Sequence, residues 1–395
     1  MNYTFSDKME ALQPSAIREI LKATADPNII SFAAGNPAPE AFPCEAVEKI
    51  TAEIMGQNPI GALQYSISEG YPPLRDMMKE MCRSRYGVMG EDDDLIIVSG
   101  AQQGIDLVCK CLCNEGDTII VENPSFVGAL NTLRSYNANL VGVAMDQDGI
   151  NIEKLEEALK ANSNTKLMYL IPNFQNPSGI TMSYEKRKAV YALAKKYGVI
   201  ILEDNPYGEL RFRGEDVPSI KTLDEDGLVV YCGSFSKVLS PGLRVGYLVA
   251  NKNLMGKIVV AKQCTDVHTT ILSQMICERF LAEYDFDQHI ANLREIYRKK
   301  CGLMISEMDK HFSPNVAHTN PEGGLFLWCT LPQGSDMLGF CQKAVENGVA
   351  MVPGNAFMAQ ATDPTTSFRM NFSTPTDEKI IEGCEILGRL TKEMF

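Results

Sequence analysis

Between residues 95 and 250, short apolar segments alternate with longer amphipathic ones. DDLIIVSG (93–100) precedes AQQGIDLVCKCL (101–112), and DTIIVENPSF (117–126) precedes VGALNTLRSY (127–136). Four more apolar runs follow, in TKLMYLIPN (165–173), YGVIILEDNPY (197–207), GLVVYCGSFSK (227–237) and GLRVGYLVAN (242–251). Short strands separated by helices are typical of βαβ units, so the pattern predicts an α/β core with a mostly parallel sheet and helices on both faces.

The pattern changes on either side of this core. After about residue 285, a long polar helical stretch (288–312) leads into PEGGLFLWCTLP (321–332) and then into alternating helix and strand signals. The first 45 residues combine a helix, SAIREILKATA (15–25), with a Gly/Pro-rich extended segment (31–43). We therefore predict an arm over residues 1–45 that packs with the small domain and the active site, a large domain over 46–285 and a smaller α+β domain over 286–395.

The charge balance argues against a nucleic-acid partner. The 395 residues include 37 Lys and Arg against 50 Asp and Glu, a net charge of −13, and no basic run is long enough to neutralise phosphates along a strand. The apolar runs are too short to span a bilayer, and the first residues lack a basic start followed by an apolar stretch. We expect a cytoplasmic protein with small-molecule substrates.

Cysteines and histidines give no sign of a metal centre. Twelve cysteines are scattered along the chain, and the densest group is Cys109, Cys111 and Cys113. A helix would place the first and third on one face, but no second Cys or His pair completes a zinc site. The four histidines form no HExxH pattern. We expect reduced, mostly buried thiols and no bound metal.

Lys237 lies directly after a predicted strand, in CGSFSKVLSPGLRVGY. The hydroxyls of Ser234 and Ser236 and the guanidinium of Arg244 are suited to binding a phosphate. A lysine in a partly desolvated site beside cations loses its proton more easily and can form a Schiff base with an aldehyde. This segment alone leaves open the alternative of a solvated lysine after a Ser-rich turn.

A second phosphate-binding element is predicted at the turn VSGAQQG, where Gly100, Ala101 and Gln102 join a strand to a helix. Small residues there let backbone N–H groups at the helix N-terminus approach an anion. A glycine that merely ends the strand is the alternative. No G-x-G-x-x-G follows a strand in this sequence, which removes most support for a dinucleotide site.

Two further strand ends carry different chemistry, with Asn173 and Asn176 after one and Asp204 and Tyr207 after the other. A buried carboxylate needs a positive partner, and a protonated pyridine nitrogen would serve for Asp204. Asn176 and Tyr207 could bind a phenolic oxygen on the same ring, and Phe126 is flat enough to stack on it. A helix cap for Asp204 and core packing for Tyr207 and Phe126 are the alternatives.

These side chains all follow strands of one predicted sheet, where ligands bind in α/β proteins. Phosphate donors, an amine, a carboxylate, an amide, a phenol and an aromatic ring together describe a pocket for pyridoxal phosphate (PLP). The set as a whole therefore favours a PLP site, although each member alone has an ordinary structural explanation.

The chain resembles the class I aminotransferases of PLP fold type I, nearly from end to end. The matching segments are PSAIREIL, YSISEGYPPLR, VSGAQQG, PNFQNPSG, EDNPYGEL, GSFSKVLSPGLRVGY, PEGGLFLW, VPGNAF and SFRMNFS, in that order. The resemblance implies a fold type I transferase with PLP as its cofactor.

The resemblance also implies roles for single residues toward the cofactor. Lys237 is implied as the Schiff-base lysine, Asp204 as the partner of the pyridine nitrogen, and Asn176 and Tyr207 as partners of the phenolic oxygen. Phe126 takes a position that is usually aromatic in the family. The implied phosphate ligands are Ser234, Ser236, Arg244 and the turn formed by Gly100, Ala101 and Gln102.

Toward the substrate, Arg369 in SFRMNFS matches the arginine that binds the α-carboxylate with two parallel hydrogen bonds. Asn176 and the backbone of Gly35 are expected beside it. Tyr65 matches the tyrosine that reaches the phosphate of the neighbouring subunit, which implies a homodimer with shared active sites. A plain loop aromatic is the alternative for Tyr65.

The arm resembles most the subgroup of 2-aminoadipate, kynurenine and broad aromatic aminotransferases, in which the arm helix can cover the substrate. Arg18 matches an arginine able to meet a distal carboxylate. A solvated helix charge is an equal alternative, because Ile17, Ile20 and Leu21 share one face and Arg18 lies off it. Some transcription regulators carry the same fold after a DNA-binding domain, for which this chain has neither the residues nor the charge.

We thus predict a PLP-dependent aminotransferase that works by a ping-pong route. It moves the amino group of an L-amino acid (aromatic, 2-aminoadipate-like or broad) to a 2-oxo acid, and 2-oxoglutarate is the expected acceptor. A PLP-dependent lyase, catalysing β-elimination or decarboxylation, shares the same motifs, because fold-level motifs do not decide which bond breaks. A non-catalytic PLP-binding sensor is a third reading, against which the intact Lys237, Asp204 and Arg369 count.

Overall fold

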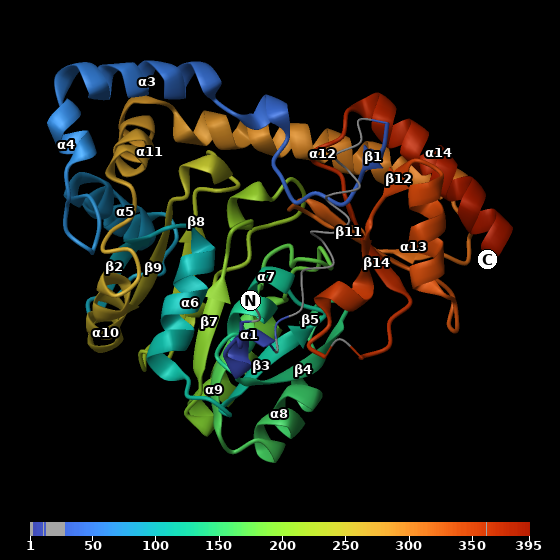
Figure 1. Ribbon diagram of the computed structural model, residues 1–395, viewed down its shortest axis with the longest axis horizontal. Coiled ribbons are helices and arrows are strands. Elements are labelled where there is room, and N and C mark those ends of the chain that lie inside the picture. The colour runs from blue at the N-terminus through green and yellow to red at the C-terminus, as the bar shows by residue number, and fades with distance from the viewer. Residues whose placement is uncertain (1–2, 11, 13–27, 361) are drawn as a thin grey trace.

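The structure, a computed structural model, describes residues 3–10, 12, 28–360 and 362–395. Within these residues the largest sheet has eight strands and forms the centre of the bigger part of the molecule (Figure 1). Its strands lie in the order β2 (Asp93–Val98), β9 (Gly246–Asn251), β8 (Val229–Ser234), β7 (Ile200–Asp204), β6 (Thr165–Leu170), β3 (Thr118–Asn123), β4 (Asn139–Asp146) and β5 (Gly149–Ile150).

Neighbours from β8 to β4 pair in parallel, whereas β9 is antiparallel to both β2 and β8, and β5 is antiparallel to β4. Because β9 reverses direction between them, β2 and β8 run the same way. The carboxyl ends of β2, β3, β6, β7 and β8 therefore meet at one edge of the sheet, where β9 begins.

Helices cover both faces of this sheet, because successive side chains of a buried strand point to opposite sides. Ile120 of β3 packs in an apolar cluster with α8 (Ile152–Ala161) and α9 (Tyr184–Tyr197). Its neighbours Ile119 and Val121 pack on the opposite side, in the cluster that contains α6 (Ala101–Leu112) and α7 (Val127–Arg134). Further helices of this part are α3 (Cys44–Gln57), α4 (Pro59–Leu63), α5 (Pro72–Ser84), α10 (Lys252–Gln263) and α11 (Ile271–Glu283).

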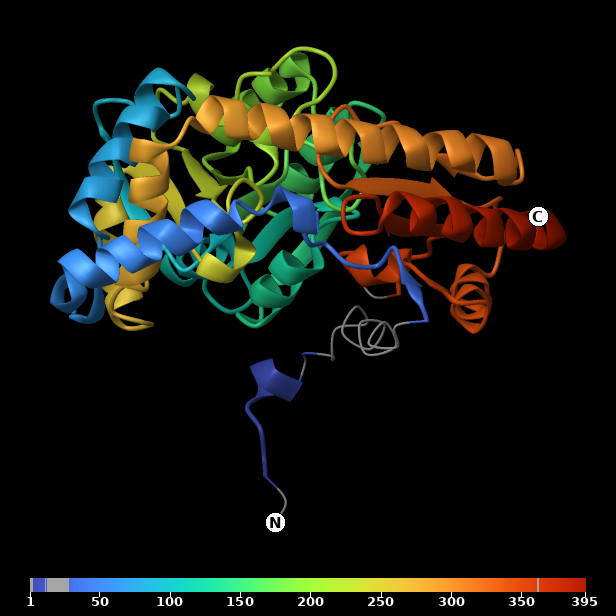
Figure 2. The same ribbon diagram turned by 90° about the horizontal axis from the view of Figure 1, so that it is seen from above.

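A smaller antiparallel sheet belongs to the C-terminal part of the chain, with strands in the order β10 (Ala317–His318), β11 (Phe326–Thr330), β14 (Ser367–Asn371) and β13 (Val352–Pro353). Its helices are α13 (Met337–Glu346), α14 (Asp377–Met394) and α12 (Phe286–His311). The long α12 extends from the larger part to this one, where it lies beside α14 (Figure 2). The predicted fold class, a mostly parallel α/β sheet with a smaller α+β unit, is confirmed, while the boundaries at residues 45 and 285 stay a prediction.

A short segment before α3 joins the C-terminal part. β1 (Ile30–Ser31) pairs in parallel with β12 (Val349–Ala350), so residues far apart in sequence share a short sheet. The short α1 (Asp7–Glu10) is the remaining α-helix of the described residues. None of the helices that the structure describes combines the length and the apolar character needed to cross a bilayer.

Candidate active site

Most of the residues predicted for chemistry follow the strand ends that meet at one edge of the large sheet, facing β11 of the small sheet. Lys237 lies three residues beyond β8, and its Nζ donates a hydrogen bond to the carbonyl oxygen of Gly35, 2.7 Å away. Burial, together with the nearby charges of Arg369 and Arg244, lowers the pKa of Lys237 to about 8. A substantial share of the amine is therefore neutral close to physiological pH.

Asp204 is the last residue of β7, and its carboxylate is buried. Its Oδ2 accepts a hydrogen bond of 2.6 Å from the hydroxyl of Tyr169 on β6, whereas its Oδ1 has no partner among the described residues. Burial raises the pKa of Asp204 to about 6, and the hydrogen bond from Tyr169 opposes this rise. A buried carboxylate oxygen without a donor is costly unless a ligand supplies one.

Arg369 of β14 is buried and sits between two aromatic rings, with its guanidinium carbon 4.3 Å from the centre of Phe326 and 5.0 Å from that of Phe357. Its Nη1 donates to Asn176 Oδ1 at 2.9 Å, and its Nη2 donates to the carbonyl of Ala33 at 2.7 Å. Burial lowers the pKa of Arg369 to about 10, so the side chain stays charged at neutral pH. Its Nε has no partner among the described residues and can donate to an anion.

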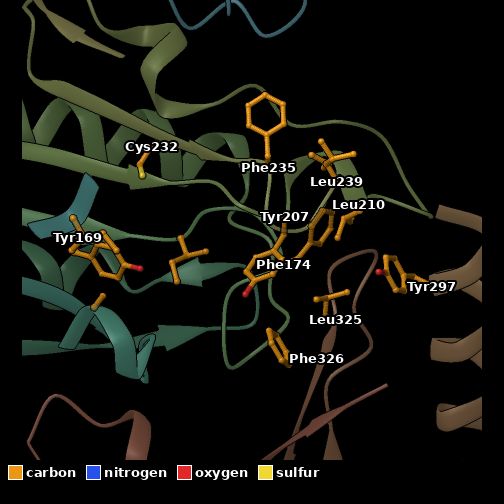
Figure 3. Packing of buried hydrophobic residues seen from close by; sticks show 14 of the residues in the cluster. Tyr169, Phe174, Tyr207, Leu210, Cys232, Phe235, Leu239, Tyr297, Leu325 and Phe326 are labelled. Atoms are coloured by element: carbon orange, nitrogen blue, oxygen red, sulfur yellow. The ribbon is translucent and has the colours of Figure 1, made fainter. Parts of the chain in front are cut away.

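Tyr207 lies between the two sheets. Its ring meets the edge of Phe326 at 5.9 Å between centroids, and Figure 3 shows both rings where the loop after β7 approaches the small sheet. Burial raises the pKa of Tyr207, so the phenol stays protonated, while the charge of Arg369 and the amide of Asn176 oppose this rise. The structure thus brings Tyr207, Asn176 and Arg369 into one connected group.

The turn at Gly100 is shaped by a close approach of Arg244. Gly100 precedes α6 with a φ of 79°, and a Cβ atom there would lie 2.4 Å from Arg244 Nη2. A side chain at this position would therefore displace the guanidinium and adopt an unfavourable backbone conformation. Arg244 Nη2 also donates to the carbonyl of Ser99 at 3.2 Å, which places the arginine against the first N–H groups of α6.

The neighbouring predicted residues are also placed by local contacts. Gln102 Nε2 donates to the carbonyl of Gly128 at 2.9 Å, and a Cβ on Gly128 would come within 2.5 Å of Phe126 Cζ. Gln102 and Phe126 therefore both lie at the first turn of α7. At the end of β8, the backbone N–H of Ser236 donates to Ser234 Oγ at 3.1 Å. Ala101 is the first residue of α6 and its carbonyl oxygen lies 3.8 Å from Cys232 Sγ.

One predicted residue, Tyr65, is not part of this group. Tyr65 is 80% exposed, and its ring meets His268 edge-on at 5.8 Å between centroids. Arg18 lies outside the described residues. Three contributors were not predicted from the sequence, Tyr169, Phe326 and Phe357. A tyrosine inside an otherwise apolar strand needs a partner for its hydroxyl, which is the signal that could have identified Tyr169.

The donor set fits the cofactor predicted from the sequence. Asp204 Oδ1 is an unpartnered acceptor that a protonated ring nitrogen would satisfy. The missing Cβ at Gly100 lets the Arg244 guanidinium lie against the turn before α6, which places a cation beside helix-terminal N–H groups, and this combination suits a phosphate. The lowered pKa of Lys237 suits an amine that reacts with an aldehyde.

Comparisons with known proteins agree with this fit. The family model for aminotransferase class I and II matches residues 27–387. An aromatic-amino-acid aminotransferase of Thermococcus litoralis is 41% identical over 98% of this chain and 94% of that protein. A 2-aminoadipate transaminase of Thermus thermophilus is 39% identical over 97% of this chain and 95% of its own.

A crystal structure of a kynurenine aminotransferase from Pyrococcus horikoshii, in complex with pyridoxamine phosphate (PMP), superposes with a TM-score of 0.94 at 38% identity, over 98% of this chain and 97% of that one. These matches extend over nearly the whole length of each protein. The chain therefore belongs to the class I and II aminotransferases, enzymes of PLP fold type I that use pyridoxal phosphate to transfer amino groups.

Proposed function

We propose that this enzyme transfers the amino group of an aromatic or 2-aminoadipate-like L-amino acid to 2-oxoglutarate by a ping-pong route. The observation that carries the proposal is the buried, charged Arg369, whose Nε lacks a partner among the described residues and whose charge acts on Lys237. A carboxylate bound there would lie near the amine that moves the proton. The relatives named for aromatic amino acids and for 2-aminoadipate support the substrate class.

When bound, PLP supplies an electron-withdrawing ring that stabilises negative charge at the α-carbon of the amino acid. We assign the aldehyde to Lys237, the ring nitrogen to Asp204 Oδ1, and the phenolic oxygen to Asn176 and Tyr207. Phe126 would pack on the ring. The phosphate would be bound by Ser234, Ser236, Arg244 and the N–H groups of the turn at Gly100, Ala101 and Gln102.

Lys237 would act first as a base and then as an acid. Its pKa of about 8 is close to physiological pH. An amine whose pKa lies near the working pH both accepts and returns a proton efficiently. The Gly35 carbonyl, which accepts from Nζ at 2.7 Å, would orient the amine near the substrate. Lys237 would thus remove the α-proton of the amino acid and return a proton at the carbon that was the aldehyde of the cofactor.

Arg369 would bind the substrate α-carboxylate, with Asn176 and the backbone of Gly35 beside it. The rings of Phe326 and Phe357 flank the guanidinium and exclude water, which strengthens its attraction for an anion. The role of Arg18 toward a distal carboxylate rests on the resemblance alone. Its test is Arg18→Ala, which should weaken glutamate and 2-aminoadipate as donors more than aromatic amino acids.

We also propose that the enzyme is a homodimer with shared active sites. Tyr65 is 80% exposed in the single chain, and Ile60 and Leu63 on α4 are 73% and 70% exposed. Exposed apolar side chains that gather in one segment are typical of an interaction surface. When a second chain covers this surface, Tyr65 of the first chain would reach the cofactor phosphate in the active site of the second chain.

The test is an absorbance titration of the purified holoenzyme with L-amino acids, followed by 2-oxoglutarate. Aminotransfer converts the lysine-bound cofactor to the pyridoxamine form, and 2-oxoglutarate restores the first spectrum. Release of ammonia or carbon dioxide instead would indicate a lyase, and no spectral change with any donor would indicate a sensor. Lys237→Ala is the control, because it should retain the cofactor noncovalently and lose turnover.

A further inference from the structure

An ion pair between a buried lysine and the partly exposed Asp266 lies behind the turn at Gly100. Lys262, near the end of α10, is fully buried. Its Nζ donates to Gln103 Oε1 at 2.7 Å, to Asp266 Oδ1 at 2.9 Å and to Thr269 Oγ1 at 3.0 Å. An ammonium has three protons to donate, so these three oxygens satisfy it without water. A charge that is fully buried and fully paired fixes the positions of its partners.

Through these partners the ion pair reaches Ser99, the residue before Gly100. Ser99 Oγ donates to Asp266 Oδ2 at 2.7 Å, and the Ser99 backbone N–H donates to Gln103 Oε1 at 2.7 Å. The carbonyl of Ser99 accepts from Arg244 at 3.2 Å. The side chain, the N–H and the carbonyl of Ser99 are thus all hydrogen-bonded. The side chain binds Asp266 of the ion pair, and the N–H binds Gln103, which itself accepts from Lys262.

The loop after α10 is held in an uncommon conformation. Val267 has a φ of 67°, in the left-handed region that β-branched residues avoid. Such a conformation persists only where surrounding contacts determine it. Here the contacts lie on both sides of Val267. Before it, Asp266 binds Lys262 and Ser99. After it, Thr269 binds Lys262 and lies 3.1 Å from Ser99 Oγ.

We propose that Lys262 and Asp266 are positioning residues for the cofactor phosphate, acting through Ser99 to fix the N–H groups of the turn at Gly100. This inference rests on the proposed assignment of that turn to the phosphate. A turn held in advance loses no conformational freedom on binding, so part of the affinity for the phosphate comes from the ion pair.

A second Lys–Asp pair, with both side chains buried, provides a matched control. Lys221 Nζ lies 2.8 Å from Asp224 Oδ2, and the Asp224 carboxylate accepts from the backbone N–H groups of Leu228 and Val229. Val229 is the first residue of β8, so this pair lies at the opposite edge of the sheet from the strand ends that form the site. Disrupting it tests general stability without touching the turn.

The experiment measures the affinity of the cofactor-free full-length chain for PLP and for pyridoxal, which lacks the phosphate, by absorbance titration. We expect Asp266→Asn and Ser99→Ala each to lower the affinity for PLP roughly tenfold, the effect of losing one charge-assisted hydrogen bond. Pyridoxal affinity should not change, because Lys237 still binds its aldehyde. Asp224→Asn should lower the melting temperature and leave the ratio of PLP to pyridoxal affinity at the wild-type value.

Arg244→Ala separates this inference from the assignment on which it rests. If Arg244→Ala lowers the ratio of PLP affinity to pyridoxal affinity, and Ser99→Ala and Asp266→Asn do not, the positioning role is overturned and the phosphate assignment stands. If wild type binds both ligands equally, the phosphate assignment and the inference fail together. Ser99→Ala leaves both charges of the ion pair in place, so the test survives if Asp266→Asn does not fold.

Discussion

The Nζ of Lys237 donates a hydrogen bond to the carbonyl oxygen of Gly35, a residue 202 positions earlier in the sequence. Gly35 belongs to the segment that follows β1, which itself pairs with β12 of the C-terminal part. The proposed reactive amine, which follows a strand of the large sheet, is therefore oriented by a segment attached to the other part of the molecule. Any relative movement of the two parts would act directly on this amine.

The reactivity of Lys237 should depend steeply on pH. Its pKa of about 8 lies below the 10.5 of an exposed lysine, so the neutral amine forms as the pH rises through 8. We expect the rate at which the cofactor-free enzyme binds PLP covalently to rise roughly tenfold from pH 7 to pH 9, as the neutral fraction does. Stopped-flow absorbance measures this rate. Arg369→Ala should move the midpoint upward, and a wild-type midpoint near 10.5 would contradict the assignment.

Asp204→Asn should separate stability from activity. The folded-state pKa of Asp204 is about 6, above the usual 3.8, so between these pH values the unfolded chain binds fewer protons than the folded one. The carboxylate therefore destabilises the cofactor-free fold increasingly as the pH rises from about 4 to 6. The full penalty, on the order of 3 kcal/mol at 1.36 kcal/mol per pH unit, persists above pH 6. We expect Asp204→Asn to raise the melting temperature of the cofactor-free protein at pH 8.

The same variant should lose most of its transamination, because a neutral amide does not keep the ring nitrogen protonated. The melting temperature of wild type should fall between pH 4 and pH 6 relative to the variant, which isolates the titration of this one carboxyl. A variant less stable than wild type at pH 8 without cofactor would show that Asp204 Oδ1 finds a donor within the protein.

Tyr169→Phe should alter the pH profile with little change in packing. The hydroxyl of Tyr169 donates to Asp204 and lowers the pKa of that carboxyl, so its removal raises the pKa further. The acid limb of kcat/KM should therefore move to higher pH. Tyr191→Phe is the matched control, because the Tyr191 hydroxyl donates to the exposed carboxylate of Asp226 at 2.8 Å. Identical pH profiles for both variants would exclude the proposed role of Tyr169.

Arg369→Lys should weaken substrate binding while the cofactor stays bound. Lysine keeps the charge but lacks the planar fork, so it cannot contact Asn176, the Ala33 carbonyl and a carboxylate together. We expect kcat/KM for the amino acid to fall roughly a hundredfold, the loss of one to two charge-assisted hydrogen bonds. Steady-state kinetics with a cofactor-content assay measures this. The exposed Arg389→Lys is the control, and a similar loss there would point to a nonspecific effect.

Much of the arrangement could be predicted from the apolar runs. Five of the six runs are followed by residues predicted for the site, and the sixth, in 242–251, is preceded by Arg244. The parallel sheet brings Asp204, Lys237 and Asn176 to one edge, as the pattern indicates. The register between strands was not predictable. Tyr169 lies opposite Leu202 of β7, and this pairing, which gives Asp204 its donor, follows from how β6 and β7 align.

The ion pair between Lys262 and Asp266 could not be predicted from the sequence either. Lys262 and Asp266 are four residues apart at the end of a helix, a spacing that is common on exposed helix surfaces. Only the packing of α10 against α6 removes Lys262 from water and brings Gln103 and Ser99 to it. Such burial depends on long-range contacts that local sequence does not encode.

If active sites are shared in a homodimer, two impaired variants should restore each other. In a hybrid of Lys237→Ala and Tyr65→Ala chains, one site lacks both residues, and the other combines Lys237 of one chain with Tyr65 of the other. Random reassembly of equal amounts makes half of the dimers hybrid, so roughly a quarter of wild-type activity should return. The assay is activity after joint unfolding and refolding, with each variant refolded alone for comparison. Activity no higher than the mean of the two variants would mean that Tyr65 serves its own chain or no site at all.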